Sequence, residues 1–350
     1  MKIAKDHFLQ ISFTTMHLTR SFLSKIKSES FLIGILHLIG LLSLYTDADK
    51  RGRPYVYSTT VMLRCYVVRI WMRIPSNNCL HHYFSIHTRY NRKIMKSCGL
   101  DTLPDRRTFD RRFKVLPVGS MISTMGKRFV TEKIVDASVS SVDSSMVRAK
   151  NGHVWHRKQM ESGYLPRSGI DTDARWGFSG TRGWLFGYKL HMVSSTGKLV
   201  VPLSAGITTA NVYDNQMYCN LVESLHDKIK YVVADAGYDD QNLYDYSRYR
   251  GIRLVCPVRR YRHTKGERLV MISFYKSKKG QKIYRNRGVS IEPLFCTVKE
   301  TFGISTSPVS GFDNVSSYLL MCVFVYQVVV YWNSITSNVN PRYIKRMLGN

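Results

Sequence analysis

The chain has 350 residues, which is enough for one large domain or for two or three smaller ones with a sizeable core. Lys and Arg number 52 against 24 Asp and Glu, so the formal net charge is +28. A surplus of this size attracts a polyanion, with nucleic acid as the first candidate and an anionic membrane surface as the second. The seven cysteines are odd in number and show no zinc-finger spacing. They argue against a closed disulfide framework and favour a reducing compartment.

Two stretches, residues 31–45 and 318–332, are strongly apolar. Each is 15 residues long and carries a polar residue, His37 or Gln327, so each is short for a membrane span. The first also lies too far from the N-terminus for a signal peptide. We therefore expect two buried helices or strands and no membrane partner.

The first 135 residues are the most basic part, with 23 Lys and Arg against 8 Asp and Glu. Residues 46–53 are polar and predict a linker. Helices are predicted over residues 58–73 and 76–86, and Pro104 opens a third. That third helix is amphipathic, with phenylalanines at 109 and 113 among four arginines: Arg106, Arg107, Arg111 and Arg112. Such an arrangement suits a helix-turn-helix-like DNA-binding unit, although an ordinary solvated surface helix explains it equally well.

From about residue 136 the pattern changes to short strands with loops between them. A strand over residues 137–142 ends at Asp143, and another over 230–234 ends at Asp235. The helix predicted over residues 289–302 carries Glu292, with Pro293 in its first turn. The remaining predicted elements are a hairpin of residues 184–193 and 198–207, helices over 214–226 and 240–250, and a strand over 252–258. This order predicts a mixed α/β layer structure, with acids at the carboxyl ends of its strands.

Asp143, Asp235 and Glu292 form the candidate catalytic set, with spacings of 92 and 57 residues. Cleavage of a phosphodiester by metal requires oxygen ligands, because Mg²⁺ is a hard cation that prefers carboxylates. In a two-metal site the ions lie about 3.5–4 Å apart, so three converging acids are a sufficient minimum. Each acid also has a plainer interpretation. Asp143 could form an Asx turn or a cap, Asp235 could reach solvent, and Glu292 could interact with a helix dipole.

At these residues the sequence resembles the DDE transposases of bacterial insertion sequences, over roughly residues 50–335. Several strings carry the resemblance: KRGRPYVYS, LPDRRTFDRRF, VDSSMVRA around Asp143, GYKLHMV with PLSAGITTANVYDNQ, VVADAGYDD around Asp235, and YRNRGVSIEPLFCTVK around Glu292. The last string is similar to the family's Tyr-Arg-Glu-Lys signature and is the most specific of them.

The resemblance implies a ribonuclease H-like mixed sheet flanked by helices, preceded by a mostly helical DNA-binding region. It implies that Asp143, Asp235 and Glu292 bind two divalent metal ions, Mg²⁺ or alternatively Mn²⁺. It also implies that Tyr284, Arg287 and Lys299 contact DNA. The family signature places three residues between its Arg and Glu, whereas four separate Arg287 from Glu292 here, so Arg285 is a rival for that role.

The implied function is metal-dependent cleavage of DNA at transposon ends, followed by transfer of the cut strand into target DNA. The expected partners are the double-stranded terminal inverted repeats, the target DNA and a second copy of the chain bound with it. The expected location is the bacterial cytoplasm, in association with the nucleoid. Three regions are expected: a basic DNA-binding region (1–135), a catalytic domain (136–335) and a basic tail (336–350). The alternatives are a ribonuclease H-like nuclease without strand transfer, or a decayed protein that binds DNA without catalysis.

Overall fold

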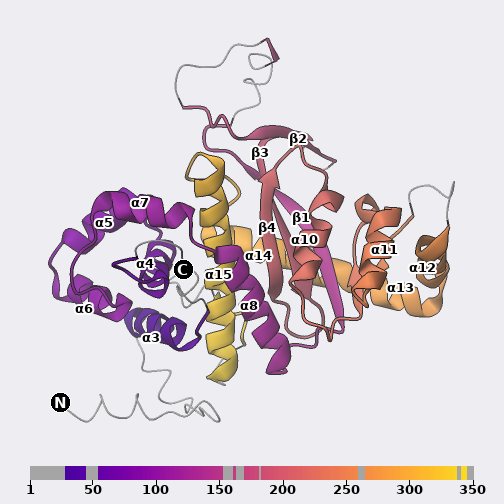
Figure 1. Ribbon diagram of the computed structural model, residues 1–350, viewed down its shortest axis with the longest axis horizontal. Coiled ribbons are helices and arrows are strands. Elements are labelled where there is room, and N and C mark those ends of the chain that lie inside the picture. The colour runs from indigo at the N-terminus through magenta and orange to yellow at the C-terminus, as the bar shows by residue number, and fades with distance from the viewer. Residues whose placement is uncertain are drawn as a thin grey trace.

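The computed structural model describes residues 28–44, 54–152, 161–162, 169–180, 183–258, 265–336 and 340–344. Its elements form three groups: a cluster of N-terminal helices, a mixed sheet, and helices that flank the sheet (Figure 1). The linker predicted over residues 46–53 lies outside the described residues. The mixed sheet flanked by helices, with helices preceding it, is the predicted fold class.

The N-terminal helices start where the sequence offers caps. The side chain of Ser58 accepts a hydrogen bond from the Val61 N–H, and Ser76 accepts one from the Cys79 N–H. A helix that the sequence did not predict, α6, starts behind Thr88 and ends at Gly99, whose φ is +86°. The helices of this group are α3 (Ser28–Leu41), α4 (Thr59–Trp71), α5 (Asn77–Ser85), α6 (Arg89–Cys98) and α7 (Arg106–Lys114). The next helix, α8 (Val118–Thr131), packs instead on the sheet and on the last helix of the chain.

The sheet combines antiparallel and parallel pairing. Strand β3 pairs antiparallel with β1, β2 and β4, whereas β1, β5 and β6 run parallel to one another. The strands are β1 (Val139–Arg148), β2 (Arg175–Ser179), β3 (Gly183–Ser195), β4 (Pro202–Thr209), β5 (Tyr231–Val233) and β6 (Arg253–Val255). The predicted hairpin is therefore present as β3 and β4, and the predicted short strands are present as β5 and β6.

The elements that connect and cover the sheet lie between its later strands or follow the last strand, β6. They are η1 (Asp214–Met217), α10 (Tyr218–Glu223), η2 (Ala236–Tyr238), α11 (Gln241–Tyr249), α12 (Gly266–Lys276), α13 (Lys278–Tyr284), α14 (Asn286–Phe302) and α15 (Phe312–Ile335). Helix α14 packs on β1 and β3, while α8 and α15 pack on β4. The helices α12 and α13 and the strand β2 were not predicted from the sequence.

Helix α15 is the centre of the hydrophobic core. It runs between the N-terminal helices and the sheet and contacts α3, α4, α7, α8 and β4 (Figure 1). By length and composition it could cross a membrane, yet 89% of its most apolar window is buried inside the protein. Gln327 in its middle is fully buried and donates hydrogen bonds to the carbonyls of Ile122 on α8 and Pro202 at the start of β4. Both apolar stretches of the sequence are therefore helices, α3 and α15.

Two local predictions were wrong, and both concern the site described next. Strand β1 does not end at Asp143 but continues to Arg148, because β3 pairs with it along that whole length. Helix α14 begins at Asn286, so Pro293 lies inside the helix and not in its first turn. The neighbouring helix α13 leads directly into α14, which extends the helix toward the N-terminus beyond the predicted start.

Candidate active site

Asp143 lies in the middle of β1 with its side chain only 16% exposed. Its Oδ1 atom accepts a hydrogen bond of 2.9 Å from the Ser144 N–H. Burial raises the pKa of Asp143 to about 6, and the nearby charges of Asp235 and Asp214 act in the same direction. The guanidinium of Arg287 opposes this shift. Asp143 is thus a carboxylate that is largely shielded from solvent and close to two other acids. A cation beside it would stabilise its ionised form.

Asp235 follows the parallel strand β5 after one intervening residue, Ala234. The parallel register pairs Ser140 with Val232 and Ser141 with Val233, so two further residues along each chain bring Asp235 beside Asp143. The side chain of Asp235 caps η2 by accepting a 2.8 Å hydrogen bond from the Gly237 N–H. The parallel pairing of β1 and β5 therefore brings together two of the three predicted acids.

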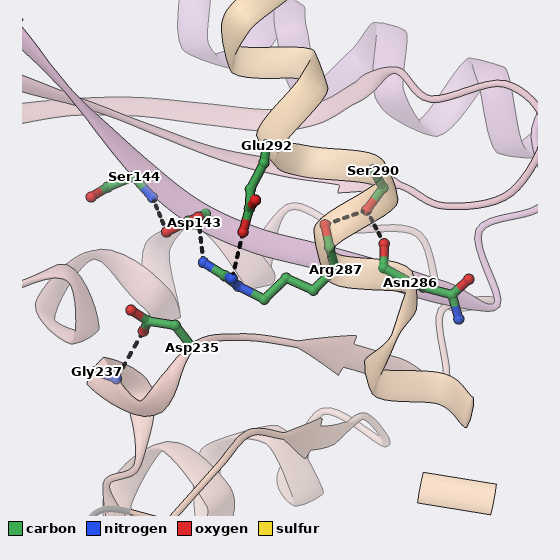
Figure 2. A network of polar contacts seen from close by, with 8 residues as sticks. All are labelled: Asp143, Ser144, Asp235, Gly237, Asn286, Arg287, Ser290 and Glu292. Atoms are coloured by element: carbon green, nitrogen blue, oxygen red, sulfur yellow. Dashed lines mark hydrogen bonds and ion pairs between the residues drawn. The ribbon is translucent and has the colours of Figure 1, made fainter. Parts of the chain in front are cut away.

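Glu292 comes from a third element, α14, and its side chain is 54% exposed. It faces Asp143 across the guanidinium of Arg287, as Figure 2 shows, with Asp235 nearby. The Nη1 atom of Arg287 lies 2.8 Å from Oε1 of Glu292, and its Nη2 atom lies 2.6 Å from Oδ2 of Asp143. Burial alone would lower the pKa of Arg287, but Asp143 and Glu292 raise it, so the guanidinium is firmly charged.

The donor chemistry of these three acids fits hard divalent cations, since all the ligands are carboxylate oxygens. The cation that bridges two of them in the structure is a guanidinium. Among the described residues, no group of three His, Cys, Asp or Glu side chains is arranged so that it could hold a metal ion. Arg287 thus occupies the space between Asp143 and Glu292, and Asp235 lies just past the end of the neighbouring strand β5.

A family model described as a transposase DDE domain matches residues 135–328, more than half of the chain, and this span includes all three acids. The chain belongs to the DDE transposase family. Among solved structures, a piggyBac transposase synaptic complex with hairpin DNA is similar, with 11% identity and a TM-score of 0.36. That alignment covers 93% of this chain and 80% of the other. No curated protein matches the sequence.

Lys299 of the transposase, which the sequence predicted as a DNA contact, is buried and donates a hydrogen bond to the carbonyl of Met146 on β1. It thereby ties α14 to the strand that carries Asp143. Tyr284 is half-buried at the end of α13 and packs edge-on against Tyr275, with 5.2 Å between ring centroids. Burial raises the pKa of Tyr284. Arg285, the rival of Arg287, is exposed.

The four arginines of α7 do not share one environment. Arg106, Arg107 and Arg111 are exposed, whereas only 3% of Arg112 is accessible to solvent. The guanidinium of Arg112 donates to the Tyr57 carbonyl at 2.7 Å and to the Thr59 hydroxyl at 2.9 Å. It also lies 3.5 Å from the centre of the Tyr55 ring. Arg112 therefore joins α7 to the start of α4, and this position does not suit the DNA contact predicted for it.

The sequence did not indicate two ion pairs, one partly buried and one almost fully buried. Lys189 on β3 lies 2.8 Å from Asp214, whose charge also acts on Asp143. Arg268 on α12 binds Asp239 through two hydrogen bonds of 2.9 and 2.8 Å, and the Asp239 side chain is only 1% exposed. Asp239 and Lys189 lie in the strings VVADAGYDD and GYKLHMV, which carried the resemblance, but no local pattern indicated their partners.

Proposed function

We propose that the transposase cleaves DNA at the ends of a mobile element and joins the freed 3′-hydroxyl to target DNA. Asp143, Asp235 and Glu292 would hold two divalent metal ions, Mg²⁺ or Mn²⁺, as members of this family usually use divalent metals. The observation that supports this assignment is the approach of Asp143 and Glu292 to one guanidinium, beside the parallel strand that leads to Asp235.

When bound, the metal ions would activate the attacking oxygen and stabilise the leaving one. The chain supplies the geometry. The Ser144 and Gly237 N–H groups fix the orientations of Asp143 and Asp235, each through one carboxylate oxygen. Lys299 joins α14 to β1 by its hydrogen bond to Met146, and so helps to position Glu292 relative to the strand. Carboxylates that are oriented in advance need little rearrangement when charge develops in the transition state.

The DNA contacts proposed outside the site are three exposed arginines of α7: Arg106, Arg107 and Arg111. They belong to the basic first third of the chain, which we propose recognises the ends of the element. We retain residues 1–135 as the DNA-binding region, 136–335 as the catalytic domain and 336–350 as a basic tail. Since two ends must be brought together, we propose a homodimer on DNA, acting in the bacterial cytoplasm at the nucleoid.

Cleavage is tested on a labelled duplex that carries the terminal inverted repeat, which the DNA flanking the gene reveals. Asp143→Asn, Asp235→Asn and Glu292→Gln should each abolish Mg²⁺-dependent nicking while end binding persists. Asp227→Asn is the matched control, because Asp227 is an exposed acid outside the site, and it should leave nicking unchanged. Normal nicking by any of the three site variants would remove that residue from the proposed set.

The same reaction separates the alternatives. Joined products on a target plasmid are expected for a transposase that transfers strands. A nuclease would give nicks without joined products, and a protein that only binds DNA would give neither at any concentration of Mg²⁺ or Mn²⁺.

A further inference from the structure

The guanidinium of Arg287 binds acids on two elements of the site. Its Nη2 atom donates to Asp143 on β1, and its Nη1 atom donates to Glu292 on its own helix, α14. We propose that Arg287 and the divalent metal ions are alternative cations for the same carboxylates. Metal binding then requires the guanidinium to leave, and the guanidinium returns when the metal dissociates. This inference rests on the proposed function, because it concerns the same three acids.

The contacts of Asp143 support direct competition between Arg287 and a metal ion for its carboxylate oxygens. Its Oδ1 atom accepts the Ser144 N–H and its Oδ2 atom accepts Arg287 at 2.6 Å, so both oxygens are engaged. The two side chains are 16% and 17% exposed, so water screens the guanidinium charge only weakly from the acids. A metal ion placed against Asp143 would therefore meet both an occupied oxygen and a strong like charge.

The spacing of Arg287 and Glu292 shows that their contact depends on the site and not on the helix. Side chains on a helix meet at spacings of three and four residues, whereas these two are five residues apart. They meet because both side chains extend toward Asp143 (Figure 2). The two carboxylates, and not the helix repeat, therefore hold the guanidinium in place.

Once released from Asp143 and Glu292, the guanidinium of Arg287 would be able to bind DNA. The exposed Lys282 and Arg285 lie just before it in the chain, so a freed guanidinium would join a basic segment beside the site. A phosphate can accept a bidentate hydrogen bond from such a group. The position of Arg287 in the structure and its predicted contact with DNA then describe two states of one side chain.

The experiment measures Mn²⁺ binding to the full-length, DNA-free protein by titration calorimetry at about pH 8. At that pH Asp143 is ionised, since burial raises its pKa only to about 6. Arg287→Gln is compared with wild type and with Arg285→Gln, which removes the same charge from an exposed neighbour. Asp143→Asn reports whether the ion occupies the proposed site. Thermal unfolding confirms that each variant is folded, and Arg287→Met replaces Arg287→Gln if that variant does not fold.

We expect Arg287→Gln to bind Mn²⁺ about tenfold more tightly than wild type or more, because a close positive charge is removed. Arg285→Gln should stay near the wild-type affinity and Asp143→Asn should lose binding. Equal or weaker binding by Arg287→Gln, with binding still lost in Asp143→Asn, would overturn the competition but leave the metal site in place. Unchanged binding by Asp143→Asn would instead overturn the site itself, and the competition with it.

Discussion

The Nη2 atom of Arg287 lies 2.6 Å from the Oδ2 atom of Asp143, although 144 residues of chain separate the two. This contact joins the helix that carries Glu292 to the central strand of the sheet. It also determines the electrostatics of the site, because Arg287 partly offsets the burial that raises the pKa of Asp143 to about 6. Because burial outweighs the effect of Arg287, the pKa of Asp143 stays raised, and the stability of the protein should depend on pH.

Asp143 should make the metal-free transposase less stable as the pH rises. Its folded-state pKa of about 6 lies above the ordinary value of 3.8, so the folded protein binds this proton more tightly than the unfolded chain. The stabilising contribution of the proton is full below about pH 4 and is lost as the pH rises through about 6. It amounts to about 2–3 kcal/mol.

The measurement is chemical denaturation of wild type and Asp143→Asn in the presence of a chelator, from about pH 4 to 7. Wild type should lose about 2–3 kcal/mol of unfolding free energy relative to Asp143→Asn as the pH rises across this range. Asp227→Asn, at an exposed position, should show no such trend. A constant difference between wild type and Asp143→Asn would contradict the prediction.

Gly237 should be required for the orientation of Asp235. A Cβ atom at this position would lie 2.8 Å from Oδ1 of Asp235, so the carboxylate must move away. We expect Gly237→Ala to lower the rate of Mg²⁺-dependent cleavage about a hundredfold, since small displacements of catalytic groups have effects of this size. The unfolding free energy should change by no more than about 1 kcal/mol.

Gly288→Ala provides the control for that variant, because a Cβ atom there meets nothing within 4 Å. In a helix this change should stabilise the fold by about 0.5–1 kcal/mol and leave cleavage intact. Equal activities of the two glycine variants would argue against an orienting role for Gly237.

The Arg268–Asp239 pair should stabilise the fold only as a complete pair. Arg268→Ala leaves a carboxylate buried without its guanidinium, which should destabilise the protein by about 3 kcal/mol or more. The double variant Arg268→Ala with Asp239→Ala should be more stable than Arg268→Ala alone, because no uncompensated charge remains. Denaturant titrations of both single variants and the double variant test this, and additive losses would contradict it.

Adjacent arginines of α7 should behave in opposite ways. Arg112→Ala removes a buried guanidinium with two hydrogen bonds and should destabilise the protein by about 2–3 kcal/mol. Arg111→Ala, at an exposed position, should change stability by less than about 0.5 kcal/mol. Arg111→Ala should instead weaken DNA binding. It should also reduce the slope of the logarithm of the binding constant against the logarithm of salt concentration by about one, the value for one phosphate contact.

Fluorescence anisotropy over a range of salt concentrations, together with thermal unfolding, distinguishes the two arginine variants. If Arg112→Ala weakened DNA binding at unchanged stability, the assignment of Arg112 to the interior would be wrong.

Most helices and strands, though not α6, α12, α13 or β2, and the order of the three acids could be predicted from the sequence, because the signals for them are local. Ser58, Ser76 and Asp240 cap helices where they were expected to lie at helix starts, and the apolar runs became α3, α15 and β5. The family was also evident from short strings, since each of the three acids lies in a string whose residue types are close together in the chain.

The partners of the charged side chains, in contrast, depend on the three-dimensional fold. Arg112 and Lys299 were expected on the surface and are buried, while Arg287 lies between Asp143 and Glu292. A long cationic side chain can reach groups on elements that are distant in sequence, and which of them it meets depends on sheet register and helix packing. Periodicity along the chain carries no information about that choice, so the cation among the acids could only be found in three dimensions.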